Sequence, residues 1–154
     1  YLNLNLKKYH YVNIISNTLY NIFNKKFVSY LVENENIQNF INNCNEKELI
    51  NSFQSFLPDK IVYCGISCVF IKKNIKASIE QYFSKYNEIP KIFIYNTEKK
   101  QLYISSNSLN KCRDIEQVLL SHILCYNVSN ILLDDKEIKY LNNWEAEEYR
   151  KNII

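Results

Sequence analysis

The 154-residue sequence predicts a single α+β domain that is mostly helical and carries one small β-hairpin at about residues 91–105. Two observations support this prediction. Apolar residues recur at helical spacing over most of the chain, and two short runs of β-branched and aromatic residues flank one polar turn. The length suits one domain with a sizeable core. We therefore expect residues 1–154 to form one unit, with a helical part (1–90) and a hairpin-and-helix part (91–154).

The first 57 residues predict a series of helices. The apolar run at 27–31 is expected to continue a helical face, and residues 48–57 to form a short helix before Pro58. The residues that recur at helical spacing are Tyr9, Val12, Ile15 and Leu19, followed by Ile37, Phe40 and Ile41.

The middle of the chain contains the longest apolar run, IVYCGISCVFI, at residues 61–71. It is too short to cross a bilayer, which needs about 20 residues. Periodicity does not decide whether it forms a buried strand or begins a helix. The helical period then returns from Ile75 through Ile79 and Phe83, before Pro90.

The hairpin follows. KIFIY (91–95) and QLYIS (101–105) have the composition of strands, and the polar segment between them predicts a turn. After a polar loop, either Ser108 or Asp114 is expected to cap the next helix.

This helix carries a histidine on its apolar stripe, so His122 is expected to face the core. A last helix is predicted from about Asp135, with Glu145 on its apolar side. The stripe that contains the histidine consists of Ile115, Val118, Leu119, His122, Ile123 and Tyr126.

Composition excludes several kinds of site. A single glycine rules out Gly-rich phosphate loops and dinucleotide fingerprints. The net charge of +3 comes from scattered lysine pairs, which we interpret as a solubilising surface. Five cysteines cannot form a complete intrachain disulfide framework. Cys64 and Cys68 form a C-x-x-x-C pattern, which indicates either buried thiols or half of a disulfide motif of the mitochondrial intermembrane space.

Residues 95–152 resemble one particular family, the mitochondrial inner-membrane zinc peptidase that processes the ATP synthase proton-channel subunit and helps to assemble it. The segment NTEKKQLYISSNSLNKCRDIEQVLLSHILCYN is similar to the family's strand, polar loop and active-site helix. The segment IKYLNNWEAEEYRKN is similar to its following helix, which has an acidic residue at the position of Glu145. The resemblance implies a zincin-like fold, in which the helix with His122 is the former active-site helix.

The departures from the family pattern predict that the peptidase site is degenerate. In an H-E-x-x-H helix, two histidines bind zinc and the glutamate is the general base. His122 matches the first ligand, but Ile123 replaces the glutamate and Tyr126 replaces the second histidine. A catalytic zinc site needs about three protein ligands, and adding Cys125 to His122 supplies only two. We therefore expect no bound metal, no cofactor, no catalytic residue and no enzymatic activity, with His122 as a buried core histidine.

The resemblance also implies a place in the cell. We expect a structural or accessory subunit of a large mitochondrial complex, first of all the ATP synthase, associated with the inner membrane through protein partners. We expect no small-molecule substrate and no transmembrane segment. Three alternatives stay open: an accessory protein of the mitochondrial ribosome in contact with rRNA, a lineage-specific helical interaction domain, and a peptidase that uses a different site.

Overall fold

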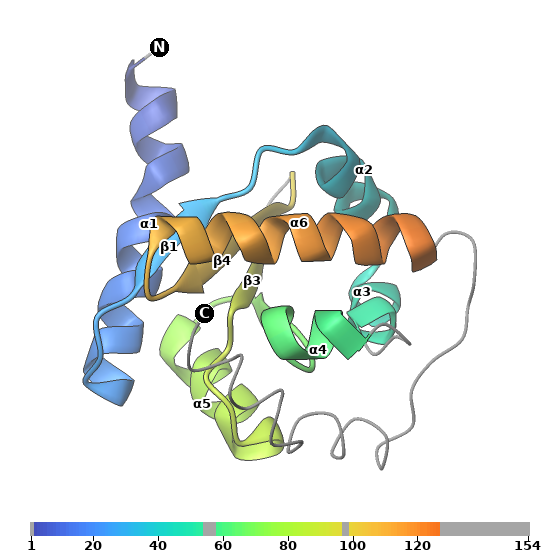
Figure 1. Cartoon of the computed structure of the whole chain (residues 1–154). Helices are drawn as coiled ribbons and strands as arrows, with labels where there is room; N and C mark the ends of the chain where they lie inside the picture. Colours follow the sequence, from blue (N-terminus) through green and yellow to red (C-terminus); the bar gives the residue numbers. More distant parts are fainter. Residues whose placement is uncertain (1, 54–57, 97–98, 127–154) are drawn as a thin grey trace.

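The structure is a computed structural model, and it describes residues 2–53, 58–96 and 99–126 (Figure 1). Six helices and four strands follow one another along these residues. In chain order they are α1 (Leu2–Phe23), β1 (Val28–Leu31), α2 (Glu35–Asn43), α3 (Glu46–Phe53), α4 (Pro58–Cys64), β2 (Val69–Ile71), α5 (Ile75–Tyr86), β3 (Ile92–Tyr95), β4 (Gln101–Ser106) and α6 (Leu109–Tyr126).

The strands form one sheet in the order β1-β4-β3-β2. β4 pairs antiparallel with β1 and with β3, whereas β2 runs parallel to β3 and is joined to it through α5. Ile92 lies opposite Ile104, and Phe93 lies opposite Tyr103. Because side chains alternate between the two faces of a sheet, the isoleucine pair faces one side and the aromatic pair the other.

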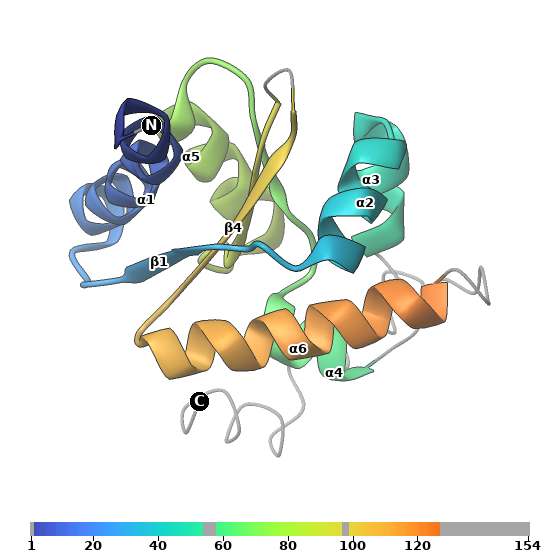
Figure 2. The ribbon, with the colours of Figure 1, turned by 90° about the horizontal axis from the view of Figure 1, so that it is seen from above.

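Helices cover both faces of the sheet, so the domain has three layers (Figure 2). α1 and α5 cover the face of the aromatic pair, and α6 with α2, α3 and α4 covers the face of the isoleucine pair. β3 is buried at all four positions, as is typical of a strand covered on both faces.

The α+β class and the hairpin are confirmed. The predicted strands at 91–95 and 101–105 correspond to β3 and β4, which pair antiparallel. The helices predicted from apolar periodicity are α1, α2, α3, α5 and α6. Of the two expected caps of α6, Ser108 is the one used, because its hydroxyl accepts a hydrogen bond from the backbone N–H of Lys111 at 3.3 Å.

Residues 1–90 are not purely helical, and the helix predicted over 27–31 is wrong. Asn24 ends α1 in the left-handed conformation (φ +54°), and its N–H bonds to the Tyr20 carbonyl. The next apolar residues form β1, which pairs with residues 103–106 of β4. A four-residue apolar run fits a helix or a strand equally well, and only the distant β4 decides between them.

The run at 61–71, for which a helix and a buried strand were the two alternatives, contains one of each. Residues 61–64 end α4, and residues 69–71 form β2. Gly65 separates the two with a φ of +84°, a conformation that glycine adopts at no steric cost.

Two further findings concern the predicted last helix and the expected absence of a transmembrane segment. The helix predicted from Asp135, with Glu145, lies outside the described residues. No helix in the described ranges is both long enough and apolar enough to cross a membrane.

The N-cap of α2 supplies a first prediction. The Asn34 side chain accepts hydrogen bonds from the backbone N–H groups of Asn36 and Ile37, at 3.0 and 3.2 Å. Asn34→Ala is expected to lower the free energy of unfolding by about 1 kcal/mol, because these donors lose their acceptor. Urea denaturation measures the change. Asn39→Ala, the same substitution at an exposed position inside α2, is the control and should not destabilise. An equal loss in both variants would contradict the capping role.

Candidate functional site

α6 brings the predicted site to the interior. In Figure 1 it runs along one face of the sheet, with α2 and α4 beside it. Its apolar stripe faces the core, as the periodicity predicted. Its buried residues are Cys112, Ile115, Leu119, His122 and Ile123.

His122 is a buried core histidine. It is 1 % exposed, and its Nε2 lies 2.6 Å from the backbone oxygen of Ser52 at the end of α3. Because a carbonyl oxygen accepts only, Nε2 carries the hydrogen of this bond. The ring also stacks with those of Phe53 and Tyr126, at centroid distances of 6.4 and 6.3 Å.

Burial controls the charge of this histidine. Desolvation first, and then the positive charge of Lys60, lower the pKa of His122 to about 4. The hydrogen bond to Ser52 acts in the opposite direction but is weaker. His122 is therefore a neutral hydrogen-bond donor at physiological pH.

Lys60 is the residue beside this histidine that the sequence analysis missed. Its side chain is fully buried. Its ammonium group donates to the backbone oxygen of Phe53 and, at 2.9 Å, to that of Ile66, and it lies 4.9 Å from the centre of the Phe53 ring. Desolvation lowers the pKa of Lys60 to about 8. Lysines are almost never fully buried unless paired, so no local signal in the sequence marks this one.

Cys64 and Cys68 lie near this lysine as free, buried thiols. Burial raises the pKa of each thiol to about 12, and the charge of Lys60 only partly opposes that shift. Both cysteines belong to the apolar core under α6. Of the two interpretations of the C-x-x-x-C pattern, the structure has the buried thiols, and at neutral pH such thiols are poor nucleophiles.

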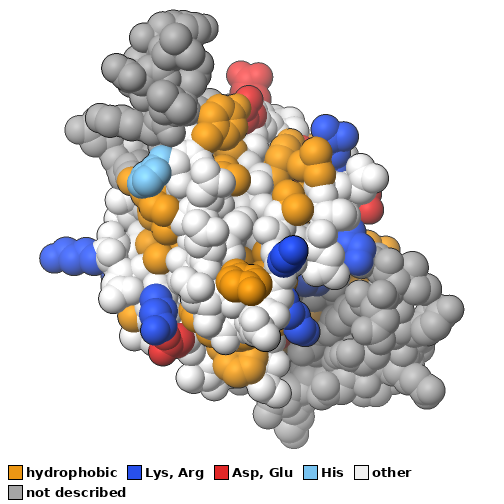
Figure 3. Space-filling model, turned by 90° about the vertical axis from the view of Figure 1, so that its left-hand side faces the viewer, with side chains coloured by type: hydrophobic (Ala, Val, Ile, Leu, Met, Phe, Trp, Pro, Cys, Tyr) orange, Lys and Arg blue, Asp and Glu red, His pale blue; other side chains and the backbone are white. Residues whose placement is uncertain are grey.

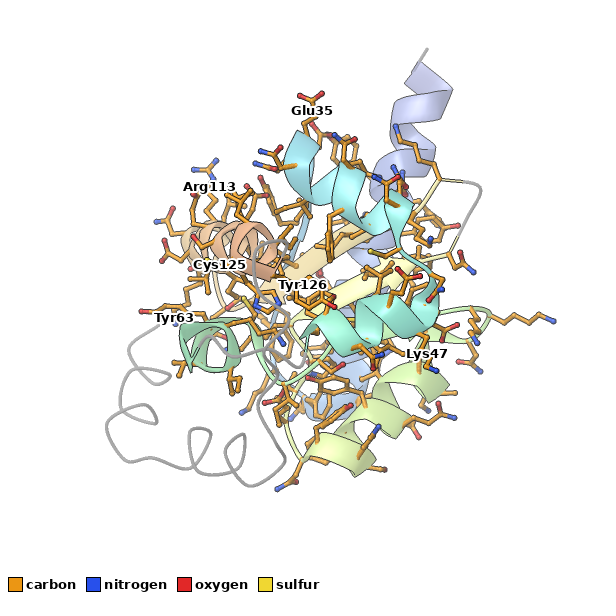
Figure 4. The ribbon with its side chains drawn as sticks, turned by 90° about the vertical axis from the view of Figure 1, so that its right-hand side faces the viewer. Glu35, Lys47, Tyr63, Arg113, Cys125 and Tyr126 are labelled. Carbon is orange, nitrogen blue, oxygen red and sulfur yellow. The ribbon has the colours of Figure 1, made fainter. Side chains whose placement is uncertain are left out.

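Of the remaining predicted positions, only Tyr126 stacks on the ring of His122. Ile123 is buried in the core. Tyr126 packs edge-on against Phe40 of α2, with ring centroids 6.1 Å apart, and Figure 4 shows it at the end of α6 facing α2 and α3. Cys125 is exposed, so it does not join His122 as a second ligand. Glu145 lies outside the described residues.

The donor set does not fit the zinc ion that a zincin holds. Nε2 of His122 is bonded to the Ser52 carbonyl, and the next position is the apolar Ile123. The buried ammonium group of Lys60 also disfavours a second cation nearby. In the part of the chain that the structure describes, no three His, Cys, Asp or Glu side chains are grouped as a metal site requires.

A polar network fixes the turn between α4 and β2, next to Lys60. A carboxylate oxygen of Glu88 accepts hydrogen bonds from the backbone N–H of Ile66, at 2.7 Å, and from the Tyr82 hydroxyl. The same hydroxyl bonds to the backbone of Ser67. Burial first, and then the charge of Glu88, raise the pKa of Tyr82 well above its usual value, so it remains a donor.

The single glycine of the chain is required at this turn. A Cβ atom on Gly65 would lie 2.7 Å from a carboxylate oxygen of Glu88 and 3.3 Å from the hydroxyl of Tyr82, both held by hydrogen bonds. Gly65→Ala is expected to lower the free energy of unfolding by about 3 kcal/mol, from a left-handed alanine and a disrupted network. Thermal and urea unfolding measure the loss.

Asn24→Ala is the control for this substitution. Asn24 is exposed and also has a positive φ, so its replacement introduces the backbone strain without the close contacts. We expect it to lower the free energy of unfolding by about 1 kcal/mol. If Gly65→Ala lost no more than Asn24→Ala, the contacts with Glu88 and Tyr82 would be unimportant.

Comparison with known proteins adds no relative. No protein-family model, no curated protein and no solved structure matches the chain.

Proposed function

We propose that this chain is a catalytically inactive, metallopeptidase-like protein that serves as a structural or accessory subunit of a large mitochondrial complex, with the ATP synthase as the first candidate. One observation supports the proposal above the others. At the position of a zincin's first zinc ligand, Nε2 of His122 is bonded to the Ser52 carbonyl inside the core. A histidine used in this way stabilises the packing of α6 on α3.

The surroundings support the same role. Ile123 is 2 % exposed, and Tyr126 packs on α2 where the second histidine of the motif would stand. Apolar and aromatic side chains thus occupy the volume that a zinc site keeps open for water. In this role the outer surface, rather than a cleft, is the functional part of the protein.

The test is native size fractionation of solubilised mitochondria, with this chain followed by mass spectrometry. Co-migration with ATP synthase subunits is the expected result. Co-migration with ribosomal proteins would replace this proposal with an accessory role in the mitochondrial ribosome. A free monomer, or absence from mitochondria, would refute both assignments.

Two substitutions sharpen the test. Tyr9 and Tyr20 of α1 are about half exposed and lie on one side of the helix, 11 residues apart. Figure 3 shows the face that carries α1, with hydrophobic side chains spread among polar ones. If this face contacts the complex, Tyr9→Glu and Tyr20→Glu should each reduce co-migration, whereas Asn21→Glu, at an exposed site on another side of α1, should not.

Metal content tests the inactive state directly. The purified chain is expected to contain far less than one zinc per molecule and to cleave no peptide. Stoichiometric zinc, or peptidase activity that disappears on chelation and returns with zinc, would contradict the proposal.

A further inference from the structure

Two tyrosines from distant parts of the chain form the closest aromatic pair among the described residues. Tyr11 belongs to α1, and Tyr95 is the last residue of β3. Their ring centres are 4.0 Å apart, with 33° between the ring planes. The next closest pair, Tyr82 and Tyr86, has its ring centres 4.8 Å apart. At the separation of Tyr11 and Tyr95, carbon atoms of the two rings are in van der Waals contact.

A third tyrosine holds this pair in place from the interior. Tyr103 of β4 is fully buried, and its hydroxyl donates a hydrogen bond to Oε1 of Gln101 at 2.9 Å. The Tyr103 ring meets those of Tyr11 and Tyr95 edge-on, at centroid distances of 6.3 and 5.7 Å. Edge-to-face packing of this kind is a favourable aromatic geometry. Tyr103 therefore supports the two stacked rings without being stacked on either of them.

The pair can be approached from one side of the molecule. A cavity of about 250 Å³ is lined by both tyrosines, by the end of β2 and by the start of α5. One water molecule needs only about 15 Å³ of such volume. Tyr11 is partly exposed, and Tyr95 keeps 8 % of its surface exposed. Water and small oxidants therefore have a route to this pair.

The protonation state of Tyr95 determines how it is oxidised. Burial first, and then the neighbouring Tyr11, raise the pKa of Tyr95 to about 12. At neutral pH the residue is therefore a protonated phenol, which releases its proton when it loses an electron. The cavity beside the ring gives that proton a route to solvent.

We propose that Tyr11 and Tyr95 are the site of an oxidative cross-link, in which a haem peroxidase acting with hydrogen peroxide joins the two rings as dityrosine. Each phenol gives up one electron and one proton and becomes a phenoxyl radical. Hydrogen peroxide takes up the two electrons and two protons and becomes two water molecules. The two radicals then form one bond between ring carbons next to the oxygens, and the hydrogen on each bonded carbon moves to the oxygen of its ring. The chain loses two hydrogen atoms in all and has both hydroxyls again.

The cross-link has a structural consequence for α1. It joins this helix covalently to the central strand β3, to which it is otherwise attached by packing. Because residues 11 and 95 are far apart in the chain, the bond closes a long loop and restricts the unfolded chain. This role is independent of the complex in which the protein resides.

Oxidation of the dilute full chain with a haem peroxidase and limiting hydrogen peroxide tests the proposal. Accessible thiols, such as that of Cys125, are first blocked with iodoacetamide so that they do not reduce the radicals. The expected products are dityrosine fluorescence, a monomer lighter by two hydrogen atoms, and one cross-linked peptide pair that contains residues 11 and 95.

Matched variants assign the bond. Tyr11→Phe and Tyr95→Phe keep the packed ring but form no phenoxyl radical, so each should lose this cross-link. Tyr20→Phe removes a tyrosine of the same helix that is 47 % exposed, and it should form the cross-link as the unchanged chain does. Cross-links that join other tyrosines, that only connect separate chains, or that persist in Tyr95→Phe would overturn the proposal.

Thermal unfolding supplies an independent readout. The purified cross-linked monomer is expected to melt about 10 °C above the unoxidised chain, because the bond closes a long loop of the unfolded chain. Tyr95→Phe treated in the same way should melt at the temperature of its untreated form. A cross-linked monomer that melts no higher than the unoxidised chain would mean that the bond forms only in a distorted structure, and this would also overturn the proposal.

Discussion

Lys60→Met is expected to remove a contribution of Lys60 that raises the stability of the unchanged protein toward alkaline pH. Burial lowers the pKa of Lys60 from 10.5 to about 8. Between these two values the unfolded chain holds a proton that the folded chain has released, so the free energy of unfolding rises with pH. From about pH 7 to about pH 10, the stability of the unchanged protein relative to the variant should increase by about 2.5 kcal/mol. Urea denaturation at a series of pH values measures this difference.

Two further variants separate charge from packing. The raised pKa values of the buried thiols and of Tyr82 make stability fall in the same pH range, but they are common to both proteins and largely cancel in the difference. Lys60→Ala also removes the buried stem, so it should be about 3 kcal/mol less stable than Lys60→Met at the same pH. Lys47→Met, on the exposed side of α3, should give a curve parallel to that of the unchanged protein. Parallel curves for Lys60→Met would show that Lys60 is hydrated in solution.

Acidification is expected to destabilise the protein through His122. Burial lowers the pKa of His122 from 6.5 to about 4. Below pH 6.5 His122 of the unfolded chain binds a proton that the folded chain does not bind. Stability is therefore lost as the pH falls from 6.5 to about 4. The shift corresponds to about 3 kcal/mol. The measurement is the free energy of unfolding at pH values across this window, compared with that of His122→Gln.

His122→Gln retains an amide donor for the Ser52 carbonyl but has no proton to gain, so its stability should fall less steeply with acid. His10→Gln replaces the other histidine of the chain at an exposed position, and its profile should match that of the unchanged protein. In Lys60→Met the window should end at a pH closer to 6.5 and so become narrower, because the charge of Lys60 no longer opposes protonation of the folded chain. Identical slopes for the unchanged chain and His122→Gln would mean that the histidine is accessible to protons.

The two titrations together describe the interior beside α6. At neutral pH this interior holds a neutral His122 and a cationic Lys60, each bonded to a backbone carbonyl at the end of α3, and Lys60 also bonds to that of Ile66 after α4. Because both polar side chains bond to backbone carbonyls, they rigidify the packing of three helices. These contacts are the physical basis for the structural role proposed for α6.

The candidate site was only partly predictable. The 3.6-residue period placed His122 on the buried stripe of α6, and the structure agrees. The period contained no information on what the ring would meet, because Ser52 is 70 residues away in the chain. Lys60 could not be found at all. Its burial arises from the carbonyls of Phe53 and Ile66, which α4 and the Gly65 turn bring around its ammonium group.

The sequence by itself determined the elements whose stabilising contacts are local. The hairpin of β3 and β4 joins strands close in the chain, and the helices follow from apolar periodicity and from caps such as Ser108, within three residues of the groups that they bond. Tertiary structure decided the rest. β1 is a strand because it pairs with β4, some 75 residues later in the chain. The run at 61–71 divides at Gly65 because Glu88 and Tyr82 hold the turn. Such choices depend on the free energy of contacts between distant segments, which exist only once the chain has folded.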